Sequence, residues 1–374
     1  MINWQEELSN LIDASNAYKF KNFDTKNPII LYGAGSLGRM AISLLNEKEI
    51  VPKYIIDKNL EGKINNIPIR KLSELTFNEI ETSLFIICIS SIEFMPIYND
   101  LIDIGCKHII QFYDYSEIFF NNILGNGWSK STLSDDERNQ VERVFQNLEH
   151  DKNSVAHYLQ FLYWKFRRIE YIYDAFPVLS NHKYFKANCF PFLSKNERYL
   201  DCGAHVGNTI LNFIEITQMQ YSKIWAFEPD KYNMTSLKEK TNKYKSIEYF
   251  QSVLSNIDEE EVLFYDNLGF ASKVDKEGNE KIHTRTIDSY KLSPTIIKLH
   301  LEGLELKALE GSQKTIIESR PIIMVLADHN EDGLYKIANF LINLENYKLY
   351  FYLHDYCGNS AVFYAIPEER ENTL

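Results

Sequence analysis

The chain lacks any apolar run of the roughly 20 residues that a membrane-spanning helix requires. Residues 1–20 also lack the apolar core of a secretory signal, because they carry Glu6, Glu7 and Asp13. We therefore expect no membrane span and no secretory leader, and we place the protein in the cytoplasm.

The sequence contains few cysteines, and their spacing forms no recognisable motif. The five cysteines are an odd number, are scattered and form no CxxC pair (Cys88, Cys106, Cys189, Cys202 and Cys357). This distribution predicts reduced thiols that pack as small hydrophobic side chains, and it gives no metal-site spacing.

Basic residues are in deficit, which leaves a net charge of −12. A nucleic-acid binder needs clustered Lys and Arg to neutralise phosphates, so we expect no nucleic-acid partner. The densest basic stretch is KFRR at 165–168, and on a helix it is interpreted as a solvated face. Repeats and low-complexity tracts are also missing, which excludes a solenoid.

What is present is enough for two packed domains. The chain has 374 residues, and 45% of them are hydrophobic. Residues 1–20 have the spacing of an amphipathic helix, and 27–47 give a strand, a glycine turn and a helix. Further strands are predicted at 51–57, 83–90 and 106–112. Strands that alternate with helices predict a parallel sheet covered on both faces, ending near residue 125.

A helical segment follows, and then a second sheet. Residues 126–185 have helical spacing, and 186–374 return to alternating strands and helices. Two aromatic-rich strands around CGNS (357–360) predict a closing antiparallel hairpin. The predicted fold is α/β, with two Rossmann-like doubly wound domains (1–125 and 186–374) joined by the helical segment.

The first glycine turn reads Gly33-Ala34-Gly35-Ser36-Leu37-Gly38, a GxGxxG between strand and helix. Asp57 ends the next strand, where a ribose-binding acid is expected, so Gly33, Gly35, Gly38 and Asp57 are candidate nucleotide-binding residues. The alternative is that a doubly wound sheet simply needs small residues at this turn. No catalytic Tyr-Lys or His-Asp set accompanies it, which disfavours NAD redox chemistry. Residues 29–112 also resemble the N-terminal domain of bacterial sugar acetyltransferases of the nucleotide-sugar type.

The second glycine turn carries an acid at a strand end. Asp201 is followed by Gly203 and Gly207, and Glu228 ends the next strand in AFEPD. DxGxxxG followed by a strand-ending acid is typical of S-adenosylmethionine binding, because the glycines let the methionine part approach the backbone and a carboxylate can accept both ribose hydroxyls. The alternative is a sheet turn with an incidental acid.

Residues 184–366 resemble the FkbM family of methyltransferases, which act mainly as O-methyltransferases on sugars and polyketide-type natural products. The matching stretches are YF (184–185), YLDCGAHVGNT (199–209), AFEPD (226–230), TRTIDSY (284–290), IKLHLEGLELKALEGS (297–312), PIIMVLADH (321–329) and the terminal aromatic strands. The resemblance implies a class I methyltransferase sheet and S-adenosylmethionine as cofactor. It implies cofactor contacts at Asp201, Gly203, His205, Gly207, Glu228 and, near the adenine, Ser252.

The chain departs from this family at one position. His300 stands where the family usually has Asp, in the pattern IK-apolar-D-apolar-EG. The departure leaves two options open: a base of different character, or a loss of chemistry.

His300 is nevertheless the first candidate for proton removal. It follows a predicted central strand, at the edge of an open α/β sheet where ligands collect, and a neutral imidazole accepts a proton near neutral pH. Glu302 and Asp328 are candidates to orient it, and His329 is the second candidate base. The alternative for His300 is a solvated strand residue. If His300, Glu302, Asp328 and His329 converged they would suit Mg²⁺, Mn²⁺ or Zn²⁺, but the sequence does not show convergence, so no metal is assigned.

The predicted function is transfer of a methyl group from S-adenosylmethionine to a hydroxyl of a sugar, nucleotide-linked or part of a surface polysaccharide, with a histidine base. Two alternatives remain: a scaffold protein whose methyltransferase half has lost activity, and an NAD-linked sugar oxidoreductase. The expected partner is a small molecule, a sugar or nucleotide-sugar. The sequence leaves the oligomeric state open, a homodimer included.

Overall fold

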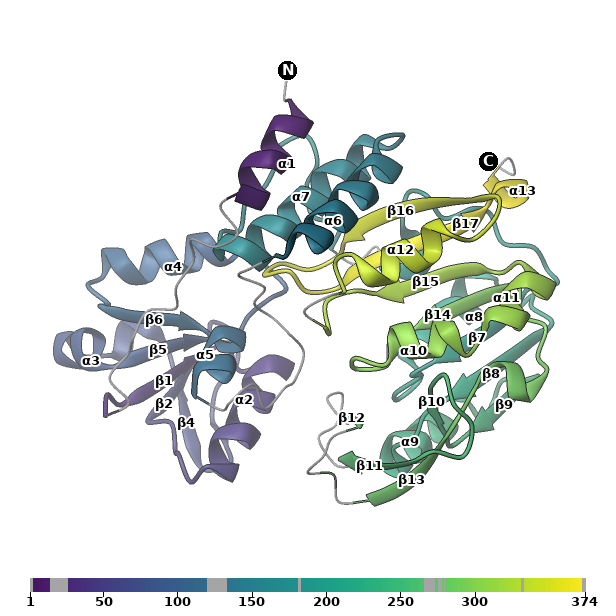
Figure 1. Ribbon diagram of the computed structural model, residues 1–374. Coiled ribbons are helices and arrows are strands. Elements are labelled where there is room, and N and C mark those ends of the chain that lie inside the picture. The colour runs from purple at the N-terminus through teal and green to yellow at the C-terminus, as the bar shows by residue number, and fades with distance from the viewer. Residues whose placement is uncertain are drawn as a thin grey trace.

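The computed structural model describes residues 3–13, 26–119, 133–180, 183–265, 273–274, 278, 280–330 and 333–371. Within these ranges the chain forms a six-stranded, a four-stranded and a seven-stranded sheet. Figure 1 shows the six-stranded sheet on one side of the molecule and the seven-stranded sheet on the other. The predicted α/β class, with two parallel-dominated sheets, is confirmed.

The six-stranded sheet has the order β3-β4-β2-β1-β5-β6, and all neighbours are parallel except β3 and β4. Its strands are β1 (Ile29–Tyr32), β2 (Tyr54–Ile56), β3 (Lys63–Ile64), β4 (Ile67–Arg70), β5 (Leu84–Ile87) and β6 (His108–Gln111). Its helices are α2 (Ser36–Glu47), α3 (Phe77–Thr82), α4 (Phe94–Asp103) and α5 (Phe112–Phe119). β1 and β5 are buried on both faces, which explains why they read as unbroken apolar runs.

The seven-stranded sheet has the order β16-β17-β15-β14-β7-β8-β9. Its strands are β7 (Arg198–Cys202), β8 (Lys223–Phe227), β9 (Ile247–Phe250), β14 (Ile296–Leu299), β15 (Ile322–Leu326), β16 (Tyr347–Leu353) and β17 (Ala361–Pro367). β17 runs antiparallel to both of its neighbours, and β15 to β9 are parallel. The predicted closing hairpin is therefore confirmed, with its second strand inserted between β15 and β16.

Helices cover both faces of this sheet, and a small sheet lies beside it. The helices are α8 (Asn208–Ile216), α9 (Lys231–Thr241), α10 (Glu305–Glu310), α11 (Gln313–Ser319), α12 (Lys336–Ile342) and α13 (Glu368–Glu371). The small sheet comprises β10 (Val253–Leu254), β11 (Glu261–Tyr265), β12 (Lys273–Val274) and β13 (Glu280–Arg285).

The helical segment predicted at 126–185 contains α6 (Asp135–Leu148) and α7 (Lys152–Arg167). Ser134 caps α6, since its hydroxyl accepts a hydrogen bond from Glu137 N and the Glu137 carboxylate accepts one from Ser134 N. Both helices share one core with α1 (Trp4–Asp13) and with β16 and β17. Figure 1 shows α1, α6 and α7 beside β16 and α12, so the first helix of the chain lies with the C-terminal sheet.

One prediction about α7 is wrong. The sequence predicts a solvated face for the basic stretch at 165–168, yet Lys165 is 2% and Arg168 8% exposed. The Arg168 guanidinium lies 2.8 Å from a carboxylate oxygen of Asp114 and 3.6 Å from one of Glu117, both on α5. The charges point inward because they join the two halves of the chain, which no local helical pattern reveals.

Further contacts attach the six-stranded sheet to the hairpin turn. The Glu170 carboxylate accepts hydrogen bonds from Phe94 N on α4 and from Cys357 N, the latter at 2.9 Å. Tyr356 N donates to Ser90 O at 2.8 Å. The turn between β16 and β17 therefore rests on the loop that follows β5.

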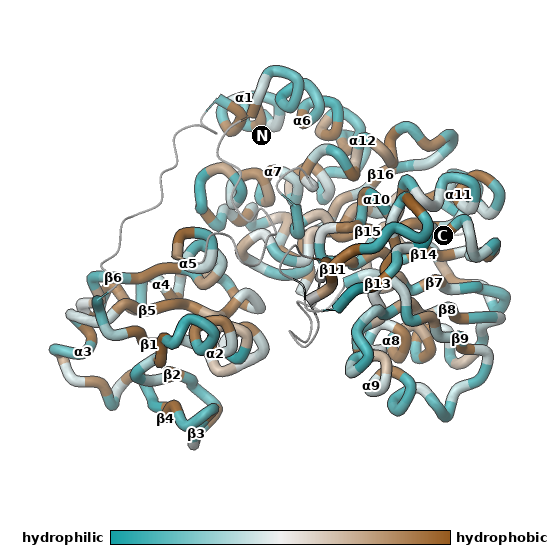
Figure 2. The backbone as a smooth tube through the Cα atoms, turned by 60° about the horizontal axis from the view of Figure 1, so that its bottom comes forward, coloured by the Kyte–Doolittle hydropathy of each residue, from teal (hydrophilic) through white to brown (hydrophobic). Residues whose placement is uncertain are grey.

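Hydropathy follows this architecture. Figure 2 shows the hydrophobic colouring concentrated along the strands and the hydrophilic colouring along the outer helices. Within the described ranges, no helix is long and apolar enough to cross a membrane. All five cysteines are free, and four of them are buried.

The Arg168–Asp114 pair yields a stability prediction. Substitution Arg168→Met leaves Asp114 buried without its cation, so we expect the free energy of unfolding to fall by about 3–5 kcal/mol. The matched control is Lys314→Ala, because Lys314 is 72% exposed beside Glu318 and its loss should change stability by less than about 0.5 kcal/mol. Urea denaturation measures both variants. Equal effects would contradict a structural role for the buried pair.

Candidate active site

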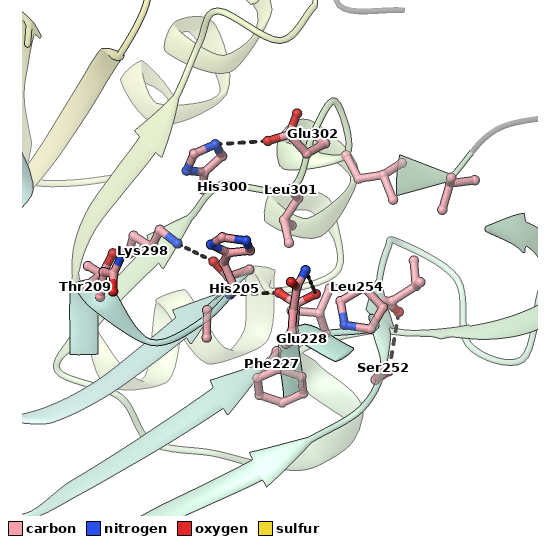
Figure 3. Close-up of a pocket in the computed structure, with 18 of the residues that line it drawn as sticks. His205, Thr209, Phe227, Glu228, Ser252, Leu254, Lys298, His300, Leu301 and Glu302 are labelled. Atoms are coloured by element: carbon pink, nitrogen blue, oxygen red, sulfur yellow. Dashed lines mark hydrogen bonds and ion pairs between the residues drawn. The ribbon is translucent and has the colours of Figure 1, made fainter. Parts of the chain in front are cut away.

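A cavity of about 270 Å³ opens at the carboxyl ends of β7, β8 and β14, as expected for a ligand site in an open α/β sheet. The side chains and turns of the predicted site converge on it. Figure 3 shows Glu228, Ser252 and Phe227 on one part of its wall, and His300 and Glu302 on another, with His205 between them. The lining also includes Lys183, Tyr184, Gly203, Ala204, Asn208, Thr209, Leu254, Phe264, Lys298 and Leu301.

Gly203 is required by a backbone contact. Its φ is +83°, and a Cβ built there would lie 1.9 Å from the carbonyl oxygen of His300. In addition, His300 N donates to Cys202 O at 3.0 Å. The turn after β7 and the loop after β14 thus pack backbone to backbone, which fixes His300 relative to the cavity.

Asp201 lies behind this turn. It is 0% exposed, and one of its carboxylate oxygens is 2.9 Å from the Lys298 ammonium, which also donates to Gly203 O at 2.6 Å. Burial raises the pKa of Asp201, and the nearby Lys298 opposes that rise. Lys298, not Asp201, reaches the cavity wall.

Glu228 follows β8 and is held by backbone donors. Its carboxylate accepts hydrogen bonds from His205 N at 2.8 Å and from Asp230 N at 3.0 Å. Burial raises its pKa to about 7. His205 has φ +50° and donates its backbone N–H to Glu228. His205 also lines the cavity.

The rest of this half of the cavity is largely apolar. Phe227, Leu254 and Phe264 line it together with Ser252, whose hydroxyl makes a 3.4 Å contact with Val253 O. Gly207 has φ +86° and precedes α8, and a Cβ there would lie 2.7 Å from Leu237 Cδ1. A flat aromatic ligand group flanked by a ribose would fit this combination of apolar walls and one carboxylate.

The four predicted catalytic residues come together at the other side. His300 Nε2 lies 3.1 Å from one oxygen of Glu302, and His329 Nδ1 lies 3.3 Å from the other. The two imidazole rings are 4.9 Å apart, and His329 Nε2 is 4.0 Å from Asp328. Glu302 thus bridges both histidines.

The electrostatics distinguish the two histidines. Burial lowers the pKa of His300 well below its ordinary 6.5, and the positive charge of Lys183 lowers it further. Burial also disfavours charge on His329, but the carboxylates of Glu302 and Asp328 outweigh it and raise the pKa of His329. Burial raises the pKa of Glu302 to about 7, against the attraction of His329. His300 is therefore the neutral imidazole at neutral pH.

The loop that carries Glu302 is held rigidly. The Glu305 carboxylate accepts hydrogen bonds from Leu301 N at 2.7 Å and Gly303 N at 3.0 Å, and Asn330 Nδ2 donates to Gly303 O at 2.9 Å. Glu302 itself has φ +50°, a strained conformation for a residue with a side chain. The loop thus presents the bridging carboxylate in a fixed direction.

Lys183, Tyr184 and Lys298 also line the site, and none of them was assigned a role from the sequence. Tyr184 has φ +62°, and its hydroxyl lies 3.3 Å from His300 Nδ1. Lys298 had a usable signal, because a lysine inside the apolar strand IIKL requires a buried partner. Lys183 and Tyr184 precede the sheet by a long stretch of chain, so nothing local indicated their position.

The first glycine turn borders a separate cavity of about 460 Å³, lined in part by Gly33, Gly35, Asp57 and Ser90. A Cβ on Gly38 would lie 2.0 Å from Gly33 O, so α2 and the turn pack closely. The Asp57 carboxylate accepts hydrogen bonds from three backbone N–H groups, of Ala34, Asn59 and Leu60. Those bonds give Asp57 a structural role in the turn, whatever the cavity binds.

The chain is similar to a known protein family and to solved structures. Residues 201–349 match the family model described as the methyltransferase FkbM domain. Comparison with curated proteins gives no match. The crystal structure of methyltransferase FkbM from Methylobacillus flagellatus KT is similar with a TM-score of 0.66 and 17% identity, over 97% of this chain and 100% of that chain.

Two smaller proteins are similar over part of the chain. An rRNA methylase from Streptococcus thermophilus has a TM-score of 0.29 and 13% identity, over 47% of this chain and 89% of its own. The putative methyltransferase SMU.1697c from Streptococcus mutans, in complex with SAH, has a TM-score of 0.29 and 14% identity, over 46% and 90%.

The seven-stranded sheet with its helices thus has the fold of a class I methyltransferase. The stretch that matches the FkbM domain, residues 201–349, lies within the span of 184–366 that resembles this family in sequence. The resemblance of residues 29–112 to sugar acetyltransferases stays a prediction.

The contact at Gly203 can be tested against a glycine with the same backbone but open space. Gly203→Ala should lower the free energy of unfolding by several kcal/mol, since backbone atoms must move, and should reduce S-adenosylmethionine binding. Gly62 has φ +96° and no atom within 4 Å of where a Cβ would lie, so Gly62→Ala should lower it by only about 1–2 kcal/mol. Urea denaturation and calorimetric titration measure the difference, and comparable losses would refute the steric argument.

Proposed function

We propose that the protein transfers a methyl group from S-adenosylmethionine to a hydroxyl of a sugar, nucleotide-linked or part of a surface polysaccharide. The observation that carries this proposal is the neutral His300, held by Glu302, on the wall of the same cavity that Glu228 borders. A cofactor site and a proton acceptor on one cavity are what this reaction requires.

The residues of the cavity fit S-adenosylmethionine. Glu228 has a buried carboxylate that can accept both ribose hydroxyls, and the apolar wall near Ser252 suits an adenine ring. The turn at Gly203 lets the methionine part lie against the backbone, and Lys298 can meet its carboxylate. Asp201 would act on the ligand through Lys298 and the turn.

When bound, S-adenosylmethionine supplies an electrophilic methyl group, which an oxygen accepts while the sulfur keeps the bonding electron pair. The chain must then align the hydroxyl, exclude water and remove one proton. His300 suits proton removal because Glu302 accepts its Nε2–H, which leaves the lone pair on Nδ1. The acceptor hydroxyl would bind at Nδ1, beside the hydroxyl of Tyr184.

The substrate class rests on the FkbM likeness. The cavity at the first glycine turn supports a nucleotide-linked acceptor, because a glycine turn before α2 offers backbone N–H groups to a phosphate. Mass spectrometry of the co-purified ligand separates S-adenosylmethionine from NAD, the cofactor of the oxidoreductase alternative.

Glu228 gives cofactor binding a pH dependence. The ionised carboxylate accepts two hydroxyls and the protonated one accepts fewer, so affinity should be highest well above pH 7 and fall as the pH drops through about 7. Glu228→Gln should weaken S-adenosylmethionine binding by about tenfold or more and abolish this dependence. Calorimetric titration from pH 5.5 to 8.5 measures both. A pH dependence that persists in Glu228→Gln would assign it to another group.

His300 should matter for turnover and not for cofactor affinity. His300→Ala should lower formation of S-adenosylhomocysteine by about 10²–10⁴-fold, with S-adenosylmethionine affinity changed by less than about twofold. His300→Asp, which introduces the usual family residue, should retain more activity than Ala. The control is His283→Ala, an exposed histidine on β13.

A panel of nucleotide-sugars serves as acceptors in this assay. Full turnover by His300→Ala would refute the base assignment. Bound S-adenosylmethionine without product, across the panel, would favour the scaffold alternative.

A further inference from the structure

Three donor atoms of the acceptor side face one point. One possible ligand atom from each of His300, Glu302 and His329 lies within 4.8 Å of the other two. The two histidine–carboxylate distances are 3.1 and 3.3 Å. Ligands bound at about 2.0–2.2 Å to one ion lie roughly 3.0–3.4 Å apart, and each histidine nitrogen already lies at such a distance from one of the two Glu302 oxygens.

The other nitrogen of each histidine has a polar neighbour. Tyr184 places its hydroxyl 3.3 Å from His300 Nδ1, and Asp328 places a carboxylate oxygen 4.0 Å from His329 Nε2. That oxygen of Asp328 is buried and makes no hydrogen bond to the described residues, while the other accepts one from Ser360 N at 2.8 Å. Metal-binding histidines are typically held in this way by a hydroxyl, carbonyl or carboxylate.

The cluster is rigid on the protein side and open on the cavity side. Glu305 and Asn330 clamp the loop that carries Glu302. His300 and Glu302 line the cavity, whereas His329 lies behind them and is 7% exposed. Three protein ligands with the remaining positions facing a cavity is the arrangement of a catalytic rather than a structural metal site.

We propose that His300, Glu302 and His329 bind one divalent cation of the Zn²⁺ or Mn²⁺ type. Two imidazoles and one carboxylate favour these borderline ions over Mg²⁺ and Ca²⁺, which prefer oxygen ligands. The acceptor hydroxyl then binds the open side of the ion.

The consequence for chemistry rests on the proposed methyl transfer. A bound cation lowers the pKa of a hydroxyl on it, so the proton leaves to solvent and the oxygen becomes the nucleophile. His300 Nε2 is then a ligand and cannot donate its N–H to Glu302. Ligand and general base are therefore exclusive roles of His300, and the metal content of the protein decides between them.

Metal binding can be measured without cofactor or acceptor, so its outcome is independent of the proposed function. Tag-free full-length protein is stripped with a chelator, dialysed, and titrated separately with Zn²⁺, Mn²⁺ and Mg²⁺. Elemental analysis should find about one Zn²⁺ or Mn²⁺ per chain and no retained Mg²⁺. Absence of stoichiometric Zn²⁺ and Mn²⁺ would overturn the proposal.

Variants locate the ion. Glu302→Ala and His329→Ala should each weaken Zn²⁺ binding by about 100-fold or more, and Asp328→Asn by about tenfold. His205→Ala, which removes another histidine of the same cavity, should leave it within about twofold. Unchanged affinity in Glu302→Ala and His329→Ala would overturn the assignment.

A spectroscopic measurement on the wild-type protein tests the site without relying on the folding of any variant. Co²⁺ in the wild-type protein should give visible ligand-field bands that Zn²⁺ displaces, and their absence would count against the site. Chelation should also lower formation of S-adenosylhomocysteine at unchanged S-adenosylmethionine affinity. Full turnover by metal-free protein would overturn the role given to the ion and leave His300 as the base.

Discussion

The buried ion pair between Lys298 and Asp201 holds the site together. The two residues are direct neighbours in the register of β14 and β7, at the centre of the seven-stranded sheet. Lys298 also binds Gly203 O, so one ammonium joins the strand, the acid and the glycine turn. A buried charge without its partner is strongly destabilising, which makes this geometry difficult to alter. The cofactor turn and the loop with His300 are therefore fixed to each other.

Burial has opposite effects on the groups around this pair. It raises the pKa of Glu228 and of Glu302 to about 7, and it lowers the pKa of His300. At neutral pH the carboxyl groups of Glu228 and Glu302 are therefore only partly ionised and the imidazole of His300 is uncharged. All three residues line the same cavity. Such shifts are common at sites of proton transfer and ligand binding, and here they coincide with a cavity.

Much of the fold follows from local pattern. The apolar strands β1 and β5, the glycine turns and the closing hairpin have periodicities and turn residues that a sequence displays directly. The burial of Lys165 and Arg168 cannot be seen in the sequence. Helical spacing shows which residues share a face of the helix but not what covers that face. The carboxylates that pair with Arg168 lie on α5, more than 50 residues away in the chain, and Lys165 donates to Asp328 O, which is farther still.

The candidate site likewise contains some features that the sequence reveals and others that only the fold reveals. Glu228 and the turn at Gly203 are recognisable because their spacing is local, within one strand–turn–helix unit. The approach of His329 to Glu302 depends instead on the pairing of β15 with β14. Tyr184 reaches His300 from a segment more than 100 residues earlier, so only the folded chain reveals that contact.

The hairpin turn between β16 and β17 connects the acceptor side to the first half of the chain. Ser360 N binds Asp328, and the Ser360 hydroxyl accepts a hydrogen bond from Lys183 on the cavity wall. Four residues earlier, Tyr356 N binds the carbonyl of Ser90, which borders the cavity at the first glycine turn. The same turn thus contacts the residues behind the His300 cluster and the wall of the other cavity. Hydrogen bonds through this turn therefore connect the first sheet to Asp328.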